Sequence, residues 1–465
     1  MDKISSGIAE FDYILDGGFP SGASVLIVGR PGSGKTILAH QIMFHNARQD
    51  NKVIYLTTLA EPQVKVMRFQ KEFTYFDTTK FQKSVIYYDL GGILRKLGPA
   101  RVLLTIDELL KKYEPGMMII DTIKIFADII PGMTEFREFI LDLSLRLATW
   151  GCTTLLLCEY SEEDIEIRPE SAIADGIICL YGNEEKHFQK RFMRILKMRG
   201  TNHVSGETVF KITSNGIEVF PRLNPVVNAQ FYSQINQRVS TGVPGLDALM
   251  GGGILRGTTT LLSGSAGIGK TFLCLSFATA GFTQKEKTVF VSFEESPAQL
   301  IHDFLNLGIN LEQYISAGLL QIMHVSPIEL DVDEHVYRIQ KLVRDMQAER
   351  LVIDSISAFE IGMSNKVKYT DYVWALTDFF KTQGVSVLLT HEMHNSGSTS
   401  SLTKHGISYV ADNLVMLHYQ EEVYGMKRLV RVLKMRSSSH STELGEMIID
   451  QYGVSIVPMT QAIFS

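Results

Sequence analysis

Short apolar runs alternate with longer amphipathic stretches along most of this chain. Strand-like runs occupy residues 25–28 and 259–263, and a helix-like segment follows each of them, at 37–46 and 272–281. Alternating strand and helix patterns of this kind are typical of βα units built around a buried sheet. The pattern therefore predicts an α/β protein in which helices flank a mainly parallel, twisted sheet.

The pattern is present twice. Residues 3–36 align with 238–271 without a gap at an offset of 235, so that Lys35 matches Lys270. Three later pairs repeat at nearly the same offset, namely 53–62 with 288–297, 117–123 with 350–356 and 194–203 with 431–440. A period this long means that each unit is a whole domain. We expect domains at 1–224 and 238–465, joined by a Pro-, Asn- and Gln-rich linker at 225–237.

Composition narrows the class of protein. The chain has 465 residues, of which 45% are hydrophobic and 21% charged, and this excludes a disordered, collagenous or coiled-coil protein. Its four scattered cysteines favour neither a disulfide scaffold nor a zinc site and are typical of a reducing compartment. No apolar run approaches the ~18–20 residues of a membrane helix, so we expect a cytoplasmic protein that does not enter the membrane.

Two glycine-rich segments carry the clearest chemistry. Residues 29–36 and 264–271 both fit GxxxxGK[ST], between a strand-like and a helix-like run. In this motif backbone N–H groups and the helix N-terminus face phosphate oxygens, the lysine reaches the β- and γ-phosphates, and the threonine hydroxyl holds Mg²⁺. We expect ATP and Mg²⁺ as ligands. The predicted nucleotide-binding residues here are Gly32, Ser33, Gly34, Lys35, Thr36 and Ile37, and Gly267, Ile268, Gly269, Lys270, Thr271 and Phe272.

Two aspartates are candidates for the magnesium shell. Asp121 and Asp354 each end an apolar run and precede a small hydroxyl residue. A carboxylate at the end of a strand, downstream of a phosphate loop, supports magnesium in phosphoryl-transfer sites. The predicted magnesium sets are Thr36 with Asp121, and Thr271 with Asp354 and Glu295.

The two halves differ where hydrolysis needs a carboxylate to activate water. The second half offers Glu294 and Glu295 directly after a strand, whereas the first has Leu59 and Ala60 at the aligned positions. We therefore predict Glu294 and Glu295 as catalytic, with the first domain binding nucleotide but hydrolysing it slowly. Glu61 would rescue the first site if its loop shifted by one residue; the alternative for the second half is that its acid pair is surface charge.

A basic strand pattern, LKMR, recurs at 196–199 and 433–436. Because side chains alternate along a strand, Lys197 and Arg199 project to one face, as do Lys434 and Arg436. Paired cations are costly to bury without an anion, and a phosphate is a natural partner. The alternative is an exposed strand edge with solvated cations.

These features together resemble the KaiC family of RecA-like ATPases. The resemblance rests on the tandem phosphate loops, the SSG and STG openings, FEESP, the IDS segment and the two LKMR strands, and runs from Lys3 to about Val457. It implies a double-ring homohexamer with ATP between subunits. The residues implied to contact the neighbour's ATP are Lys197, Met198, Arg199, Thr201 and His203 in the first ring, and Lys434, Met435, Arg436 and His440 in the second. Ser437 stands where the first half has Gly200.

The resemblance also implies autophosphorylation in the second domain. The matching stretch, 402–417, places Ser408 and Tyr409 at the family's hydroxyl pair. In-line transfer tolerates little misplacement, and a tyrosyl hydroxyl lies further from its backbone than a threonyl one, so Ser408 is the expected phosphoacceptor rather than Tyr409. The alternative is an ordinary polar pair.

Partners are less specified. The chain ends within eight residues of Val457, without the longer tail that recruits KaiA in clock-type relatives, so a KaiA-type activator is not expected, while a KaiB-like partner stays open. We expect an ATP-driven timing or signalling hexamer. The alternatives are a RecA- or DnaB-like ATPase on single-stranded DNA, which the net charge of −6 disfavours, and a scaffold joined by nucleotide.

Overall fold

The structure is a computed structural model that describes most of the chain. The described residues are 2–58, 63–165, 168–185, 188–222, 237–306, 308–326, 331–362, 366–393, 410–423, 425–451 and 453–459. The chain divides into two compact units, Met1–Arg222 and Leu223–Ser465, called the first and second domains below. Most of the expected linker lies outside the described residues, so its bounds stay a prediction.

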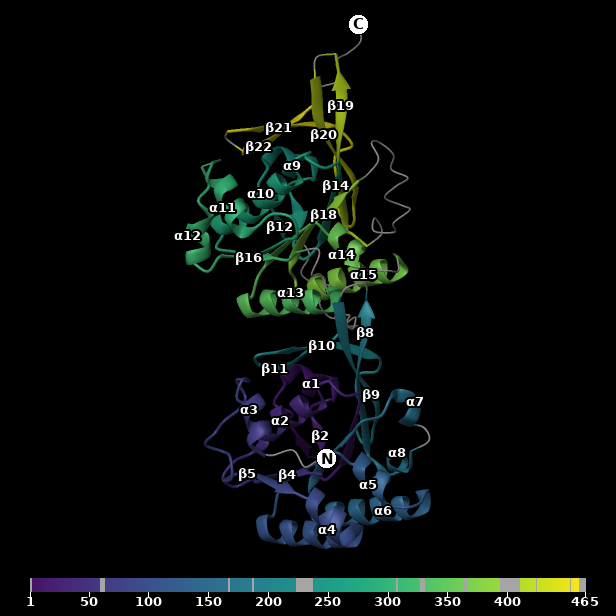
Figure 1. Cartoon of the computed structure of the whole chain (residues 1–465). Coiled ribbons are helices and arrows are strands. Elements are labelled where there is room, and N and C mark those ends of the chain that lie inside the picture. The colour runs from purple at the N-terminus through teal and green to yellow at the C-terminus, as the bar shows by residue number, and fades with distance from the viewer. Residues whose placement is uncertain are drawn as a thin grey trace. The chain divides into compact units, whose positions relative to one another are not determined.

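Each domain is built on a nine-stranded sheet (Figure 1). The strand order is β11-β10-β9-β8-β3-β7-β6-β4-β5 in the first domain and β16-β15-β17-β18-β14-β19-β20-β21-β22 in the second. Strands β8 to β5 in the first order are parallel, as are β16 to β19 in the second, and the remaining neighbours are antiparallel. The predicted α/β class, with two mainly parallel sheets, is confirmed.

The strands of the two domains correspond in their order across the sheet. In the first they are β3 (Ser24–Val28), β4 (Val53–Thr57), β5 (Val85–Asp89), β6 (Met117–Asp121), β7 (Thr153–Cys158), β8 (Gly176–Glu185), β9 (Phe188–Met198), β10 (Glu207–Thr213) and β11 (Gly216–Phe220). In the second they are β14 (Thr259–Gly264), β15 (Thr288–Ser292), β16 (Leu320–His324), β17 (Arg350–Asp354), β18 (Ser386–Glu392), β19 (Asn413–Glu422), β20 (Gly425–Met435), β21 (Gly445–Asp450) and β22 (Gly453–Pro458). Short two-stranded sheets precede each domain's main sheet, β1 (Lys3–Ile4) with β2 (Phe19–Pro20) and β12 (Arg238–Val239) with β13 (Ile254–Leu255).

Helices pack on both faces of each sheet. Those of the first domain are α1 (Ala9–Ile14), α2 (Lys35–Asn46), α3 (Gln63–Gln70), α4 (Gly91–Tyr113), α5 (Lys124–Ile129), α6 (Met133–Thr149), α7 (Glu162–Ile165) and α8 (Pro169–Ile173). Those of the second are α9 (Pro244–Leu249), α10 (Lys270–Thr283), α11 (Pro297–Leu305), α12 (Leu311–Ser316), α13 (Val332–Met346), α14 (Ser357–Gly362) and α15 (Lys366–Thr382). Among the described residues, no helix is both long enough and apolar enough to cross a membrane.

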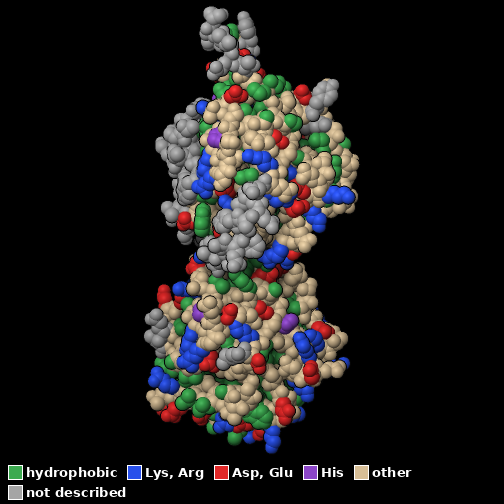
Figure 2. Space-filling model, turned by 180° about the vertical axis from the view of Figure 1, so that it is seen from behind, with side chains coloured by type: hydrophobic (Ala, Val, Ile, Leu, Met, Phe, Trp, Pro, Cys, Tyr) green, Lys and Arg blue, Asp and Glu red, His purple; other side chains and the backbone are tan. Residues whose placement is uncertain are grey.

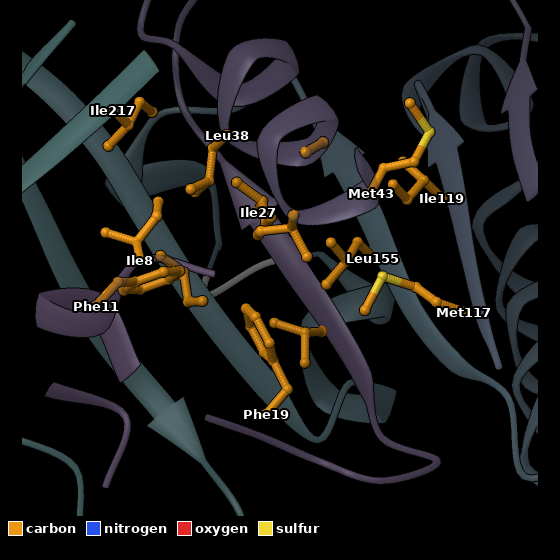
Figure 3. Close-up of a cluster of buried hydrophobic side chains, with 14 of the residues drawn as sticks. Ile8, Phe11, Phe19, Ile27, Leu38, Met43, Met117, Ile119, Leu155 and Ile217 are labelled. Atoms are coloured by element: carbon orange, nitrogen blue, oxygen red, sulfur yellow. The ribbon is translucent and has the colours of Figure 1, made fainter. Parts of the chain in front are cut away.

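The core follows from strand alternation. In β3, Val25 and Ile27 pack with helix α2 on one face, whereas Leu26 and Val28 pack with α4 and α6 on the other. Figure 3 shows the first of these clusters, with Ile27 between the helix and neighbouring strands. Strands covered on both faces are nearly continuous apolar runs, which explains why the strand segments of this sequence are so hydrophobic.

This layout positions the site. The parallel strands of each sheet end at a common edge, where β3 and β14 lead into the helices α2 and α10. In open α/β sheets, ligands bind outside the carboxyl ends of the strands. The candidate site is therefore expected at this edge in each domain.

Candidate nucleotide and magnesium sites

Each phosphate loop is a tight turn between a strand and a helix. Gly32 and Gly34 have φ of 79° and 101°, and Gly267 and Gly269 have φ of 69° and 107°. This left-handed region favours glycine, because a side chain there is strained. Helices α2 and α10 begin directly after the second glycine of each pair, so their first N–H groups face the loop and make an anion-binding N-terminus.

The loop lysines fold back over their own loops. Lys35 Nζ donates to the carbonyl oxygens of Gly29 and Arg30 at 2.8 and 3.0 Å, and Lys270 Nζ donates to those of Gly264 and Ser265 at 3.0 and 2.9 Å. Burial lowers the pKa of both lysines, and nearby carboxylates act in the opposite direction. A desolvated ammonium held inside a phosphate loop is suited to a polyanion such as a triphosphate.

The threonine–aspartate pairs have the chemistry that magnesium requires. Thr36 Oγ1 donates to Asp121 Oδ2 at 3.2 Å, and Thr271 Oγ1 donates to Asp354 Oδ2 at 2.7 Å. The described residues hold no cluster of three or more His, Cys, Asp or Glu that would cage a metal. Phosphate-bound Mg²⁺ does not need one, because it takes one or two protein oxygens together with phosphates and water. These residues therefore fit the ion.

The second domain adds an acid pair at the same edge. Glu294 and Glu295 follow β15, and the Ser292 hydroxyl accepts from the Glu295 N–H at 3.0 Å. Burial raises the pKa of both carboxyl groups, and the charge of Asp354 raises it further. The charge of Lys270 acts in the opposite direction on the pKa of Glu294. A carboxylate with a raised pKa is a better general base near neutral pH.

The matching loop of the first domain is not described. Leu59, Ala60 and Glu61 lie outside the described residues. Whether Glu61 occupies the catalytic position therefore stays a prediction.

Two further acids lie at the sites and were not predicted. Glu159 directly follows β7, and Glu392 ends β18, each beside its phosphate-loop strand. Their charges raise the pKa of Lys35 and Lys270 respectively, against the effect of burial. Strand register pairs Val28 with Cys158, and Ser263 with His391, which makes Glu159 and Glu392 equivalent at an offset of 392 − 159 = 233. This is the offset that also relates Asp121 to Asp354.

The basic strand residues have partners within their own domains. Lys197 Nζ donates to the carbonyl of Ala174, directly after helix α8, at 2.6 Å and to that of Ser171, within this helix, at 3.3 Å. Lys434 Nζ donates to the carbonyl of Ala411 at 2.7 Å. Main-chain carbonyl oxygens thus accept hydrogen bonds from both lysines.

The arginines of the LKMR segments are anchored by carboxylates that sequence reasoning did not single out. Arg199 Nη1 lies 3.2 Å from Asp175 Oδ1, and Arg436 Nη1 lies 3.9 Å from Asp412 Oδ1. The guanidinium side chains are still 62% and 51% exposed.

The remaining residues of the basic set lie on or near the same loops. Met198 and Met435 end their strands and are buried, whereas Thr201, His203 and His440 follow and are half-buried. Ser437 has φ of 61°, close to the 74° of Gly200, so the substituted residue keeps the left-handed turn. Ser408 and Tyr409 lie outside the described residues.

The sheet order and the paired phosphate loops define a class: two tandem RecA-like domains of the P-loop ATPase type. The sequence model of the family described as "ATPase: KaiC" matches residues 4–224 and again 239–461. The chain belongs to this KaiC ATPase family, as its motifs predicted.

Curated relatives of this family align with nearly the whole chain. The circadian clock oscillator protein KaiC of Prochlorococcus marinus (strain MIT 9313) is 29% identical over 98% of this chain and 93% of its own length. KaiC of Acaryochloris marina is 30% identical over 98% of this chain and 88% of its own. The circadian clock protein KaiC3 of a Synechocystis species is 28% identical over 98% and 92%.

Proposed function

We propose that the second domain is the main site of ATP hydrolysis and that the first domain principally binds nucleotide. The observation that carries this proposal is the position of Glu294 and Glu295, whose pKa values respond to Asp354 at the second phosphate loop. The aligned residues of the first domain are Leu59 and Ala60, which have no carboxylate.

In this proposal each side chain has a separate task. Lys270 binds the β- and γ-phosphates, and Thr271 and Asp354 hold the magnesium ion, which when bound neutralises charge on the phosphates. Glu294 orients the attacking water and accepts its proton, because it is the acid of the pair that also responds to Lys270. Glu295 contributes a further carboxylate to the magnesium site that Thr271 and Asp354 form.

Steady-state phosphate release tests this assignment. Replacing the acid pair in Glu294→Gln/Glu295→Gln keeps the shape of both side chains and removes the base, so turnover falls by about 10²-fold or more while nucleotide still binds. Loss of less than half the turnover would refute the proposal.

We also propose that nucleotide lies between subunits of a homohexamer, with the basic strands of one chain reaching the ATP of the next. Exposed guanidinium groups at Arg199 and Arg436 support this, since half or more of each side chain is open to a partner. Light scattering with and without Mg-ATP measures assembly. A monomer in saturating Mg-ATP contradicts the proposal.

Because relatives are named as circadian clock proteins, we propose an ATP-driven timing or signalling role. The motif resemblance adds to this proposal a cytoplasmic location, a KaiB-like partner and Ser408 as a phosphorylated residue. Intact mass after incubation with Mg-ATP, compared between the parent and Ser408→Ala, tests the kinase step. A DNA motor is less well supported, because acidic and basic side chains are interspersed over the face in Figure 2.

A further inference from the structure

The two magnesium carboxylates receive hydrogen bonds from different neighbouring strands. Tyr55 OH, on β4, donates to Asp121 Oδ2 at 2.5 Å. Thr390 Oγ1, on β18, donates to Asp354 Oδ1 at 2.5 Å. In the sheet order, β4 lies on one side of β6, whereas β18 lies on the opposite side of β17. The same carboxylate is thus supported from opposite sides in the two domains.

Strand register shows that the hydroxyl has been exchanged between two positions. Tyr55 pairs with Ile119, and its counterpart Phe290 pairs with Val352, so the second domain has a ring without a hydroxyl there. Leu157 pairs with Asp121, at the position that Thr390 occupies beside Asp354. At these two positions the first domain therefore has Tyr55 and Leu157, whereas the second has Phe290 and Thr390.

The Tyr55 phenol is held firmly in place. Its ring is 3% exposed and lies 4.6 Å from the His40 ring and 5.1 Å from the Tyr87 ring, between centroids. His40 Nδ1 in turn lies 2.7 Å from the carbonyl oxygen of Thr36, in the phosphate loop. A packed aromatic cluster therefore joins the loop to the hydroxyl that contacts Asp121.

We propose that Tyr55 is a positioning residue for Asp121 in the first magnesium–nucleotide site, and that Thr390 has this task for Asp354 in the second. Residues that hydrogen-bond a metal-supporting carboxylate fix its orientation, and their loss commonly reduces metal affinity about 10–100-fold. The inference rests on the proposed binding of magnesium and nucleotide, and it adds which hydroxyl each site depends on.

The test uses the full chain and does not require turnover. In a Lys270→Ala background, which isolates the first site, the Mg²⁺ dependence of binding is titrated with a fluorescent, non-hydrolysable ATP analogue. Tyr55→Phe raises the Mg²⁺ concentration for half-saturation about tenfold. Affinity for the analogue without Mg²⁺ stays within about twofold, because the phosphate loop is unchanged. Thr390→Val in a Lys35→Ala background gives the matching shift at the second site.

A rescue variant separates positioning from packing. Tyr55→Phe/Leu157→Thr rebuilds the arrangement of the second domain in the first and returns the Mg²⁺ dependence to within about threefold of the parent. Leu157→Thr alone measures the packing cost of this change. Tyr181→Phe, which removes a phenol donor to Glu207 at 2.6 Å outside the site, leaves the Mg²⁺ dependence unchanged.

The outcomes are distinct. A folded Tyr55→Phe variant with the parent's Mg²⁺ dependence overturns the inference, as does an equal loss of binding with and without Mg²⁺. Failure of the rescue in a folded double variant also overturns it. A parent chain that binds no magnesium–nucleotide at all refutes the proposed function and the inference together.

Discussion

The side chains that pack between the phosphate-loop helix and the sheet are of different types in the two domains. In the first domain His40, Tyr55 and Tyr87 pack there against one another, whereas in the second the corresponding positions are Leu275, Phe290 and Ile322. The glycines, the lysine and the threonine of the loop are the same in both. After duplication, the backbone cradle for phosphate was kept, while the side chains that support it changed.

The second domain has its own polar interior, at the other end of the sheet. Arg350 begins β17, is fully buried, and donates to Glu286 at 2.7 Å. It also donates to the carbonyl oxygens of Ser240 and Phe277. The first domain has Met117 and Asn51 at the matching positions. The first domain therefore has a polar aromatic cluster behind its phosphate-loop helix, whereas the second has a buried ion pair at the amino end of β17.

The largest expected effect comes from removing the second loop lysine. Lys270→Ala removes the cation that binds the β- and γ-phosphates of the active site, so turnover falls by about 10²–10³-fold. Steady-state phosphate release measures it, and bound nucleotide per chain falls from about two to about one. Retention of more than about a tenth of the parent's turnover would show that the first domain is a substantial ATPase. It would contradict the proposal that the second domain is the main site of hydrolysis.

Breaking the buried ion pair is expected to weaken only the second domain. Arg350→Met leaves Glu286 buried with Arg256 as its remaining cation, so the local free energy of unfolding falls by about 3–4 kcal/mol. Hydrogen exchange of β17 and α10 measures this loss. Arg350→Met/Glu286→Asn, which copies the first domain, recovers most of it.

The control for this variant is Arg101→Met. It removes a surface pair with Glu108 at 3.1 Å and costs less than about 1 kcal/mol. An equal loss of free energy of unfolding in both variants would show that the buried pair stabilises the second domain no more than a surface pair does.

Acid is expected to loosen the first domain through His40. Burial lowers the pKa of His40 from its ordinary value of 6.5 to about 4. Between these values the unfolded state binds a proton that the folded state does not. This stability is therefore complete above pH 6.5 and is lost as pH falls toward 4, by up to about 3 kcal/mol.

Hydrogen exchange of helix α2 at pH 7 and pH 5, corrected for intrinsic exchange rates, measures this loss. His40→Leu, which introduces the residue of the second domain, removes the pH dependence, and helix α10 around Leu275 is the internal control. Equal protection of α2 at both pH values contradicts the prediction.

The smallest expected effect comes from the first loop lysine. Lys35→Ala removes nucleotide from the domain that lacks the aligned acid pair, so total turnover stays within about twofold of the parent while bound nucleotide falls by about one per chain. Phosphate release and nucleotide content are measured on the same sample. A tenfold loss of turnover would show that the first site either hydrolyses ATP itself or controls the second.

Much of each site was accessible from the sequence, because its residues lie within short, regular patterns. The phosphate loops, Asp121 and Asp354 follow directly from strand–loop–helix and strand-end signals, and the structure places them at one edge of each sheet. Glu159 and Glu392 share the offset of 233 that already relates Asp121 to Asp354, but they lie outside the segments that the sequence comparison paired. Extending the match at this offset beyond residues 123 and 356 would have paired them.

The amino-acid sequence by itself determined the duplication, the α/β pattern, the two phosphate loops and the unequal distribution of Glu294 and Glu295. Only the tertiary structure decided which hydroxyl supports which carboxylate. Tyr55 and Asp121 are 66 positions apart, and Thr390 and Asp354 are 36 apart. Their contacts depend on the strand orders β7-β6-β4 and β18-β17-β15. Crossover connections determine these orders, and a local sequence pattern does not predict them.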